Sequence, residues 1–81
     1  MRYVKPGWRG YLEVHETKSG YTCFFCNDVE FQRMALTLEH MESLELSIPR
    51  GYKLIYKNRA EAEKVLAHIA RLSGFTKVLK P

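Results

Sequence analysis

The sequence predicts a small α+β domain with the ferredoxin-like βαββαβ order and an extra N-terminal β-strand. Its 81 residues are 46% hydrophobic and 27% charged, which is typical of one globular domain and not of a disordered chain. Apolar residues alternate in the first third of the chain and recur at helical spacing in two later stretches. We expect one domain over residues 1–81, with a tail at 1–7 and a folded core at 8–80.

The first part of this core has the pattern of a β-hairpin. Residues 8–16 read WRGYLEVHE, in which Leu12 and Val14 fall on one face and the intervening residues on the other. The cluster TKSG at 17–20 favours a turn, and the aromatic-rich YTCFFCN at 21–27 favours the returning strand.

The pattern after Asn27 admits two interpretations. Asn27 and Glu30 have the spacing of a capping box, and apolar residues follow at helical spacing, which favours a helix. These apolar residues are Phe31, Met34, Ala35, Leu38 and Met41. The alternation at 34–38 favours a strand instead, and residues 29–41 would then belong to a curled antiparallel meander capped by the C-terminal helix. We prefer the helix because the cap and the apolar stripe agree.

The second half of the chain contains the clearest helix signal. Residues 45–49 and 52–57 favour two short strands joined by a turn. Asn58 is placed to cap a helix, and Gly74 follows the last apolar position of that helix as a stop. Residues 75–80 then favour a final strand. Two helices would cover one face of the sheet and leave the other face free.

The net charge of +4 is unevenly distributed. Residues 49–81 hold eight Lys and Arg against two Glu, a charge of +6, whereas residues 1–48 hold −2. This asymmetry favours a nucleic acid or a nucleoprotein as partner, bound through phosphate contacts without base readout. The residues of the expected nucleic-acid face are Arg50, Lys53, Lys57, Arg59, Lys77 and Lys80. The same lysines would also suit a solvated sheet face.

Residues 50–57, RGYKLIYK, resemble part of the third-strand pattern of the RNA-recognition motif. The matching residues are Arg50, Gly51, Tyr52 and Ile55. Leu54, however, stands where that family has a second stacking aromatic residue. Strand alternation would also turn Tyr52 inward and Lys53 outward, because burying lysine heads costs more than burying tyrosines. This arrangement is the reverse of the family's base-stacking face, so we assign no family.

A second interpretation is a small regulator or inhibitor that binds a larger protein. Trp8 and Tyr11 would be aromatic contact anchors, and Val29 and Leu36 fall on the polar side of the expected helix. These four residues are the expected protein contacts. An acidic run farther along would suit a basic partner. That acidic run consists of Glu39, Glu42 and Glu45.

A third interpretation, a zinc- or thiol-dependent protein, comes from the C-x-x-C of Cys23 and Cys26. Zinc would need two more ligands, for which His15 and His40 are the candidates. On a strand the two thiols would point to opposite faces, so we prefer inert thiols and no bound metal. No spacing in the sequence suggests a catalytic triad, a nucleophile elbow or a phosphate-binding loop, so we expect neither catalysis nor a cofactor.

The sequence has no apolar run of membrane-spanning length and no signal-peptide core. We therefore expect a cytoplasmic protein that does not bind a membrane. In that compartment its two cysteines would be reduced.

Overall fold

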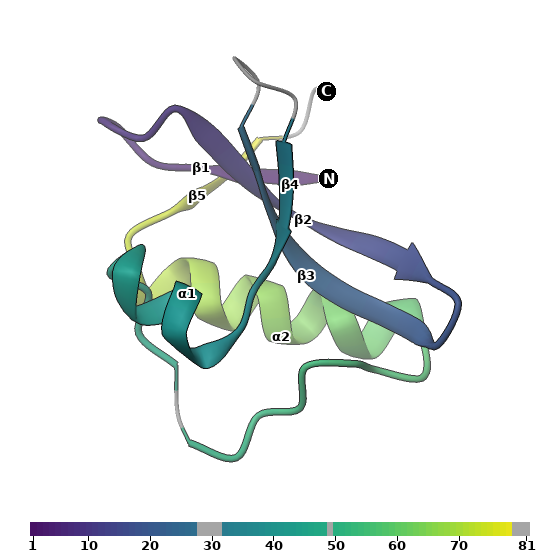
Figure 1. The fold of residues 1–81 in the computed structure, drawn as a ribbon. Coiled ribbons are helices and arrows are strands. Elements are labelled where there is room, and N and C mark those ends of the chain that lie inside the picture. Colours follow the sequence, from purple (N-terminus) through teal and green to yellow (C-terminus); the bar gives the residue numbers. More distant parts are fainter. Residues whose placement is uncertain (28–31, 49, 79–81) are drawn as a thin grey trace.

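The computed structural model describes residues 1–27, 32–48 and 50–78. In this part of the chain, five strands form one antiparallel sheet in the order β4-β3-β2-β1-β5, and helix α2 lies across one face of it (Figure 1). The elements are β1 (Arg2–Val4), β2 (Gly10–Thr17), β3 (Gly20–Asn27), β4 (Gln32–Ala35), α1 (Leu38–Ser43), α2 (Arg59–Leu72) and β5 (Thr76–Val78). The structure therefore belongs to the mixed α+β class that the sequence predicts.

Strands β2 and β3 form the predicted hairpin, which is confirmed. Leu12 pairs with Phe25 and Val14 with Cys23, so these side chains share the face that meets α2. Cross-strand neighbours on one face pack against each other, and this pairing fixes the register of the hairpin.

The predicted C-terminal helix is also confirmed as α2. The side chain of Asn58 accepts a hydrogen bond of 2.7 Å from the backbone N–H of Glu61, which caps the first turn. The buried residues of α2 recur at helical spacing and pack on the sheet; they are Ala62, Leu66, Ile69 and Ala70. At the other end Gly74 has a φ of +80°, and the N–H of Phe75 donates to the carbonyl of Ala70 at 2.8 Å. This is a Schellman ending, and Phe75 is buried behind it.

The expected tail at residues 1–7 is wrong, because β1 is an inner strand of the sheet. It pairs with β2 on one side and with β5 on the other. Tyr3 belongs to the buried core. A strand of three residues is too short to show a period in the sequence, so tertiary pairing alone reveals it.

The expected helix that starts after Asn27 is wrong over residues 32–35, which form β4. Phe25 pairs with Met34 and Cys26 with Arg33, so this stretch extends the hairpin into a meander. Helix α1 begins only after Thr37, whose hydroxyl accepts from the N–H of His40 at 3.2 Å. The helical spacing of apolar residues predicted one continuous helix, but its members belong to two elements: Met34 and Ala35 lie in β4, and Leu38 and Met41 lie in α1. The competing strand interpretation is correct for 32–35 and wrong from Leu38 onward.

The two strands expected at 45–49 and 52–57 are absent from residues 45–48 and 52–57, where Tyr56 alone makes an isolated bridge, to Tyr21. Residue 49 lies outside the described residues. Because these strands are missing and β1 to β4 follow one another in space, the ferredoxin-like topology is not the one observed. The order β4-β3-β2-β1 with α2 on one face is closer to the alternative of a meander capped by the C-terminal helix, but that alternative lacked β1 and extended the strand into the residues of α1. Locally, α1 ends at Ser43, Glu45 follows with a φ of +57°, and Leu46 is buried in the core where a strand was expected.

The expected final strand is confirmed over Thr76–Val78, and residues 79 and 80 lie outside the described part. No helix within the described ranges is both long and apolar enough to cross a membrane.

Replacing Asn58 with Ala should lower the free energy of unfolding by about 1 kcal/mol, because the N–H of Glu61 loses its acceptor. Asn58→Asp is the matched control and should retain most of the stability. Urea unfolding followed by circular dichroism measures both variants. Equal destabilisation of the two variants would contradict the assigned cap.

Candidate functional site

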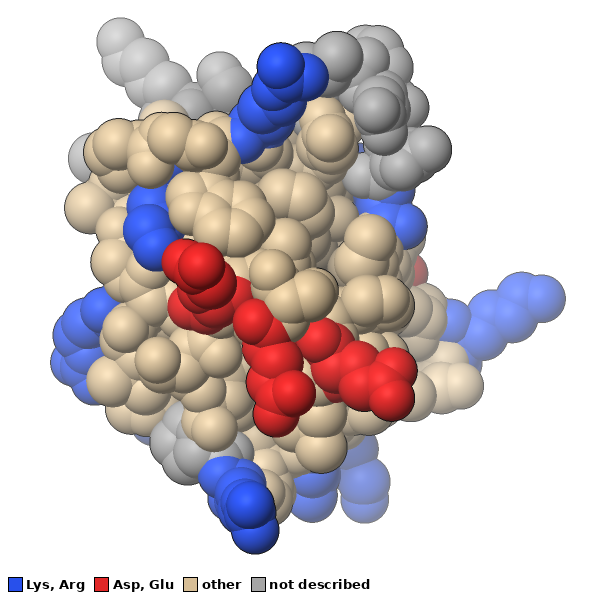
Figure 2. Space-filling view, turned by 60° about the vertical axis from the view of Figure 1, so that its left-hand side comes forward, with Lys and Arg blue, Asp and Glu red and all other residues tan. Residues whose placement is uncertain are grey.

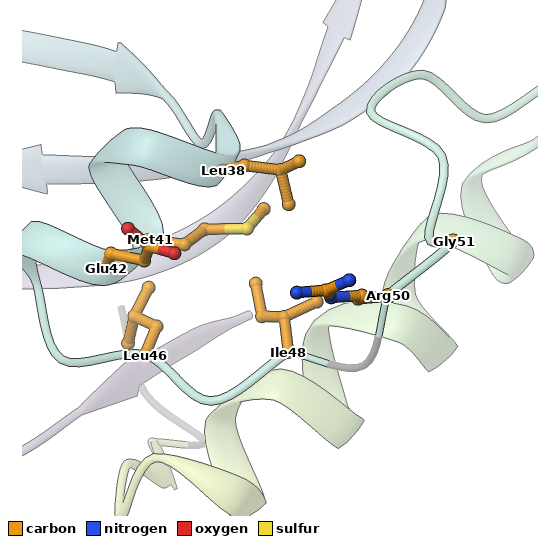
Figure 3. Close-up of a pocket in the computed structure, with 7 residues that line it drawn as sticks. All are labelled: Leu38, Met41, Glu42, Leu46, Ile48, Arg50 and Gly51. Atoms are coloured by element: carbon orange, nitrogen blue, oxygen red, sulfur yellow. The ribbon is translucent and has the colours of Figure 1, made fainter.

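Helix α1 and the chain that follows it form two walls of a hollow of about 510 Å³ (Figure 3). Its apolar lining consists of Leu38, Met41, Leu46 and Ile48. Leu38 is 59% exposed. Glu42 stands on the α1 wall and Arg50 on the other wall. The hollow is thus apolar inside and carries opposite charges on its two sides.

The side of the molecule that carries α1 is acidic (Figure 2). The exposed acidic residues in and directly after this helix are Glu39, Glu42 and Glu45. The expected acidic run is therefore placed on the surface, although the helix that holds it starts later than expected.

A second surface is built on the segment that leads from Arg50 into α2. Tyr56 donates its N–H to the carbonyl of Tyr21 at 2.7 Å and accepts from the N–H of Tyr21 at 2.8 Å. The hydroxyl of Thr22 donates to the carbonyl of Leu54 at 2.7 Å. These bonds attach the segment to the edge of β3 beyond the end of β4.

Leu54 and Ile55 remain exposed on this attached segment, at 43% and 49%. They line a second hollow of about 370 Å³, together with Phe24, Ala35 and Leu36 from the sheet side. Large exposed aliphatic residues beside an apolar hollow are a feature of interaction surfaces.

The expected nucleic-acid residues are only partly brought together. Four of them lie along one segment and are exposed: Arg50, Lys53, Lys57 and Arg59. Lys77 lies on β5, at the sheet edge opposite to β4, and Lys80 lies outside the described residues. Since the segment forms no strand, the expected basic sheet face does not exist. Within the described chain none of the four clustered residues forms an ion pair.

The expected protein contacts are mostly packing residues. Trp8 is half-buried, with its ring centre 6.2 Å from that of Phe25 and 6.1 Å from that of Phe75. Tyr11 is buried under the guanidinium of Arg2, 3.9 Å from the ring centre. Leu36 is only 2% exposed, and Val29 lies outside the described residues.

The exposed aliphatic residues were the signal that the sequence interpretation missed. Reading residues 52–57 as a strand placed Leu54 inside, between two tyrosines. In the structure Tyr56 is buried, as expected, but Leu54 and Ile55 are both exposed. Lys53 and Lys57 flank these two residues in the sequence and indicate an exposed segment. An aliphatic pair on an exposed segment could then have been predicted to contact a partner.

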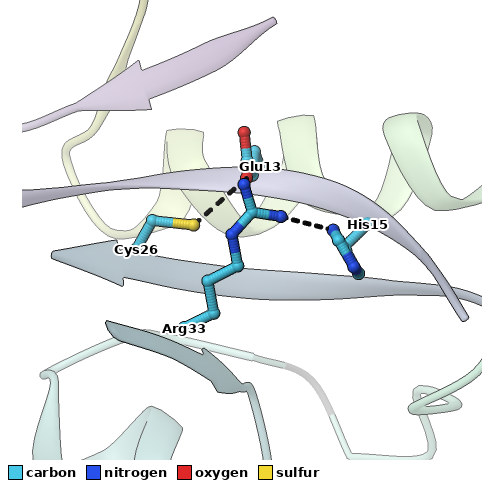
Figure 4. Close-up of polar contacts among 4 residues, drawn as sticks. All are labelled: Glu13, His15, Cys26 and Arg33. Atoms are coloured by element: carbon cyan, nitrogen blue, oxygen red, sulfur yellow. Dashed lines mark hydrogen bonds and ion pairs between the residues drawn. The ribbon is translucent and has the colours of Figure 1, made fainter. Parts of the chain in front are cut away.

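A polar cluster occupies the sheet face away from α2 (Figure 4). The Cys26 thiol donates to Glu13 Oε1 at 3.2 Å, and Arg33 Nη2 lies 3.4 Å from the same oxygen. Arg33 Nη1 donates to His15 Nδ1 at 2.6 Å, so this nitrogen accepts and the ring carries its proton on Nε2. Burial, the hydrogen bond to Glu13 and the charge of Glu13 raise the pKa of Cys26 to about 11. The thiol is thereby held in its neutral form.

The four candidate zinc ligands do not converge. Cys23 lies on the α2 side with its thiol 4.0 Å from the carbonyl oxygen of Ala62, and burial raises its pKa to about 12. Cys26 lies on the opposite face, as strand alternation predicts. His15 binds Arg33, and His40 contacts the α1 cap. Among the described residues no three His, Cys, Asp or Glu side chains are grouped as metal ligands.

Gly20→Ala should detach the segment from β3, because an added Cβ would lie 2.4 Å from the carbonyl oxygen of Tyr56. We expect a loss of stability of more than about 2 kcal/mol. Gly7→Ala is the matched control: its φ is also positive, at +87°, but nothing lies within 4 Å of the added carbon. Chemical denaturation gives both values. A loss at position 20 no larger than that at position 7 would contradict the close approach.

The Cys26 thiol should react slowly with iodoacetamide until the pH approaches 11, whereas in urea its reaction should follow an ordinary pKa of 9.0. Because folding raises this pKa, the thiol's contribution to stability is complete below pH 9 and is lost as the pH rises toward 11. Glu13→Gln should speed the reaction of Cys26 and leave Cys23 unchanged, as measured by peptide mass spectrometry. A folded-state midpoint near pH 9 would refute the assignment.

Comparison of the chain with known proteins found no relative. No family model, no curated protein and no solved structure matches the chain.

Proposed function

We propose that this chain is a non-catalytic binding domain that acts as a small regulator or inhibitor by docking another protein. The docking surface, which we call the 53–59 surface, consists of the exposed residues Lys53, Leu54, Ile55, Lys57 and Arg59. The observation that carries the proposal is the exposure of Leu54 and Ile55 beside the hollow of about 370 Å³. Leaving two adjacent aliphatic side chains in water is costly unless a partner covers them.

The chemistry of this surface suits an acidic partner with an apolar centre. Lys53 precedes the aliphatic pair in the sequence, Lys57 and Arg59 follow it, and all three are exposed without an ion pair in the described chain. Protein interfaces combine an apolar centre with a charged rim, and complementary rim charges accelerate association. The proposed partner therefore presents aliphatic or aromatic side chains flanked by carboxylates.

The state of the thiols supports binding over catalysis. A nucleophilic cysteine needs a lowered pKa, whereas burial raises the pKa of Cys23 to about 12 and that of Cys26 to about 11. Cys26 also donates to a carboxylate, which opposes its ionisation. The C-x-x-C is better explained as two packed strand residues.

Nucleic acid is the second candidate partner, favoured by four exposed cations within ten residues. These are Arg50, Lys53, Lys57 and Arg59. They could neutralise phosphates, but aliphatic side chains offer no stacking platform for bases. Two half-buried aromatic residues, Tyr52 and Phe24, already pack against histidine rings, with ring centres 5.8 Å from that of His68 and 4.8 Å from that of His15, respectively. Such binding would depend on charge and salt and not on the aliphatic pair.

Two pairs of substitutions separate these candidates. Lys53→Glu/Lys57→Glu should abolish binding of either partner. Leu54→Ser/Ile55→Ser should weaken a protein partner by more than about tenfold and leave nucleic-acid affinity unchanged. Lys64→Glu/Lys77→Glu is the matched control, because both lysines are exposed outside the 53–59 surface.

The measurement combines affinity capture from nuclease-treated cell extract with titration of fluorescent single-stranded and duplex nucleic acid at low and physiological salt. Loss of one captured protein in both test variants supports the protein partner. Tight, strongly salt-dependent nucleic-acid binding that is lost only in the lysine variant selects the second candidate. Binding that both variants retain excludes the 53–59 surface.

A further inference from the structure

We propose that two copies of this chain associate through the hollow between α1 and Arg50, with a two-fold axis through its apolar centre. This inference goes beyond the proposed function and uses a different surface. The dimer surface consists of Leu38, Met41, Glu42, Leu46, Ile48 and Arg50.

The apolar residues of this surface include a leucine that a second copy of the chain could bury. Leu38 is 59% exposed, the highest value among the large hydrophobic residues that the structure describes. It stands at the rim of a hollow of about 510 Å³, with Ile48 on the opposite wall (Figure 3). In a two-fold dimer, Leu38 of each copy can enter the hollow of the other copy, so both side chains leave water together.

The charges on the two walls select a second copy as the occupant. Glu42 stands on one wall and Arg50 on the other, and neither forms an ion pair within the described chain. A uniformly basic partner would be repelled at Arg50, and a uniformly acidic one at Glu42. A two-fold rotation about the centre brings each acidic wall against the basic wall of the other copy, so both charges are matched at once.

The neighbouring charges strengthen this match on the acidic side. Glu39 and Glu45 are exposed, and each lies three residues from Glu42 in the sequence. A small but specific dimer needs about 600 Å² from each copy. That is about a tenth of the 5699 Å² accessible surface.

A charge-exchange experiment tests the dimer by analytical ultracentrifugation over a range of concentrations. Glu42→Arg should weaken association more than about tenfold, because the new arginine faces Arg50 of the other copy. Arg50→Glu should weaken association equally, because the new glutamate faces Glu42 of the other copy. A mixture of the two variants should associate again, since each facing pair then carries opposite charges. The double variant Glu42→Arg/Arg50→Glu should likewise recover self-association.

The controls address folding and the other surface. Leu38→Asp should abolish the dimer, while Leu72→Asp, at a leucine 46% exposed at the end of α2, should not. Glu16→Arg should also leave association unchanged. The same holds for the two double variants of the 53–59 surface, Lys53→Glu/Lys57→Glu and Leu54→Ser/Ile55→Ser. A wild-type chain that stays monomeric at high micromolar concentration overturns the proposal. So does a dimer that is insensitive to Glu42, Arg50 and Leu38. Neither result bears on the 53–59 surface.

Discussion

Two backbone hydrogen bonds between Tyr21 and Tyr56 determine how the second half of the chain meets the sheet. They continue the edge of β3 after β4 has ended, and they bury the ring of Tyr56 in the core. Since the segment is fixed at that point, Leu54 and Ile55 are held outward and α2 can start two residues later at its Asn58 cap. Gly20 is required because only a residue without Cβ lets the Tyr56 carbonyl come so close. The burial of Tyr56 and the exposure of Leu54 and Ile55 thus both follow from the backbone pairing of Tyr21 with Tyr56.

The same arrangement divides the surface by charge. The segment after Tyr52 is basic and aliphatic, whereas α1 and its end are acidic. The uneven charge of the sequence therefore becomes an acidic surface on α1 and a basic surface on the chain that leads from α1 into α2. A polar cluster around Arg33 lies on the sheet face opposite α2, and within it burial together with the hydrogen bond to Glu13 raises the pKa of Cys26. The sheet face opposite α2, which the sequence was expected to leave free, thus carries paired polar side chains.

Sequence patterns predicted those elements whose signals are local. Helix α2 has its cap, stripe and glycine stop within one continuous stretch. The β2–β3 hairpin has an alternating first strand, a turn cluster and an aromatic-rich return strand, which are also local signals. The other elements depend on partners far along the chain. Strand β1 is defined by its neighbours on both sides, and β4 by the free edge of β3. Residues 52–57 alternate like a strand but make one bridge, so the expected basic face disappeared and an exposed aliphatic pair took its place. Exposure of this kind is set by tertiary attachment, which alternation alone does not encode.

The pairing of β1 with β5 joins the two ends of the described chain and has a kinetic consequence. Thr76 Oγ1 donates to the carbonyl of Val4 across a separation of 72 residues. Closing so long a loop costs entropy that local contacts must first offset, so this edge forms late in folding. Each of the two strands has three residues, and the edge is therefore also the first to open in the native state. The slowest amide exchange should then lie in β2, β3 and α2, which form a nucleus that can exist before the chain ends meet.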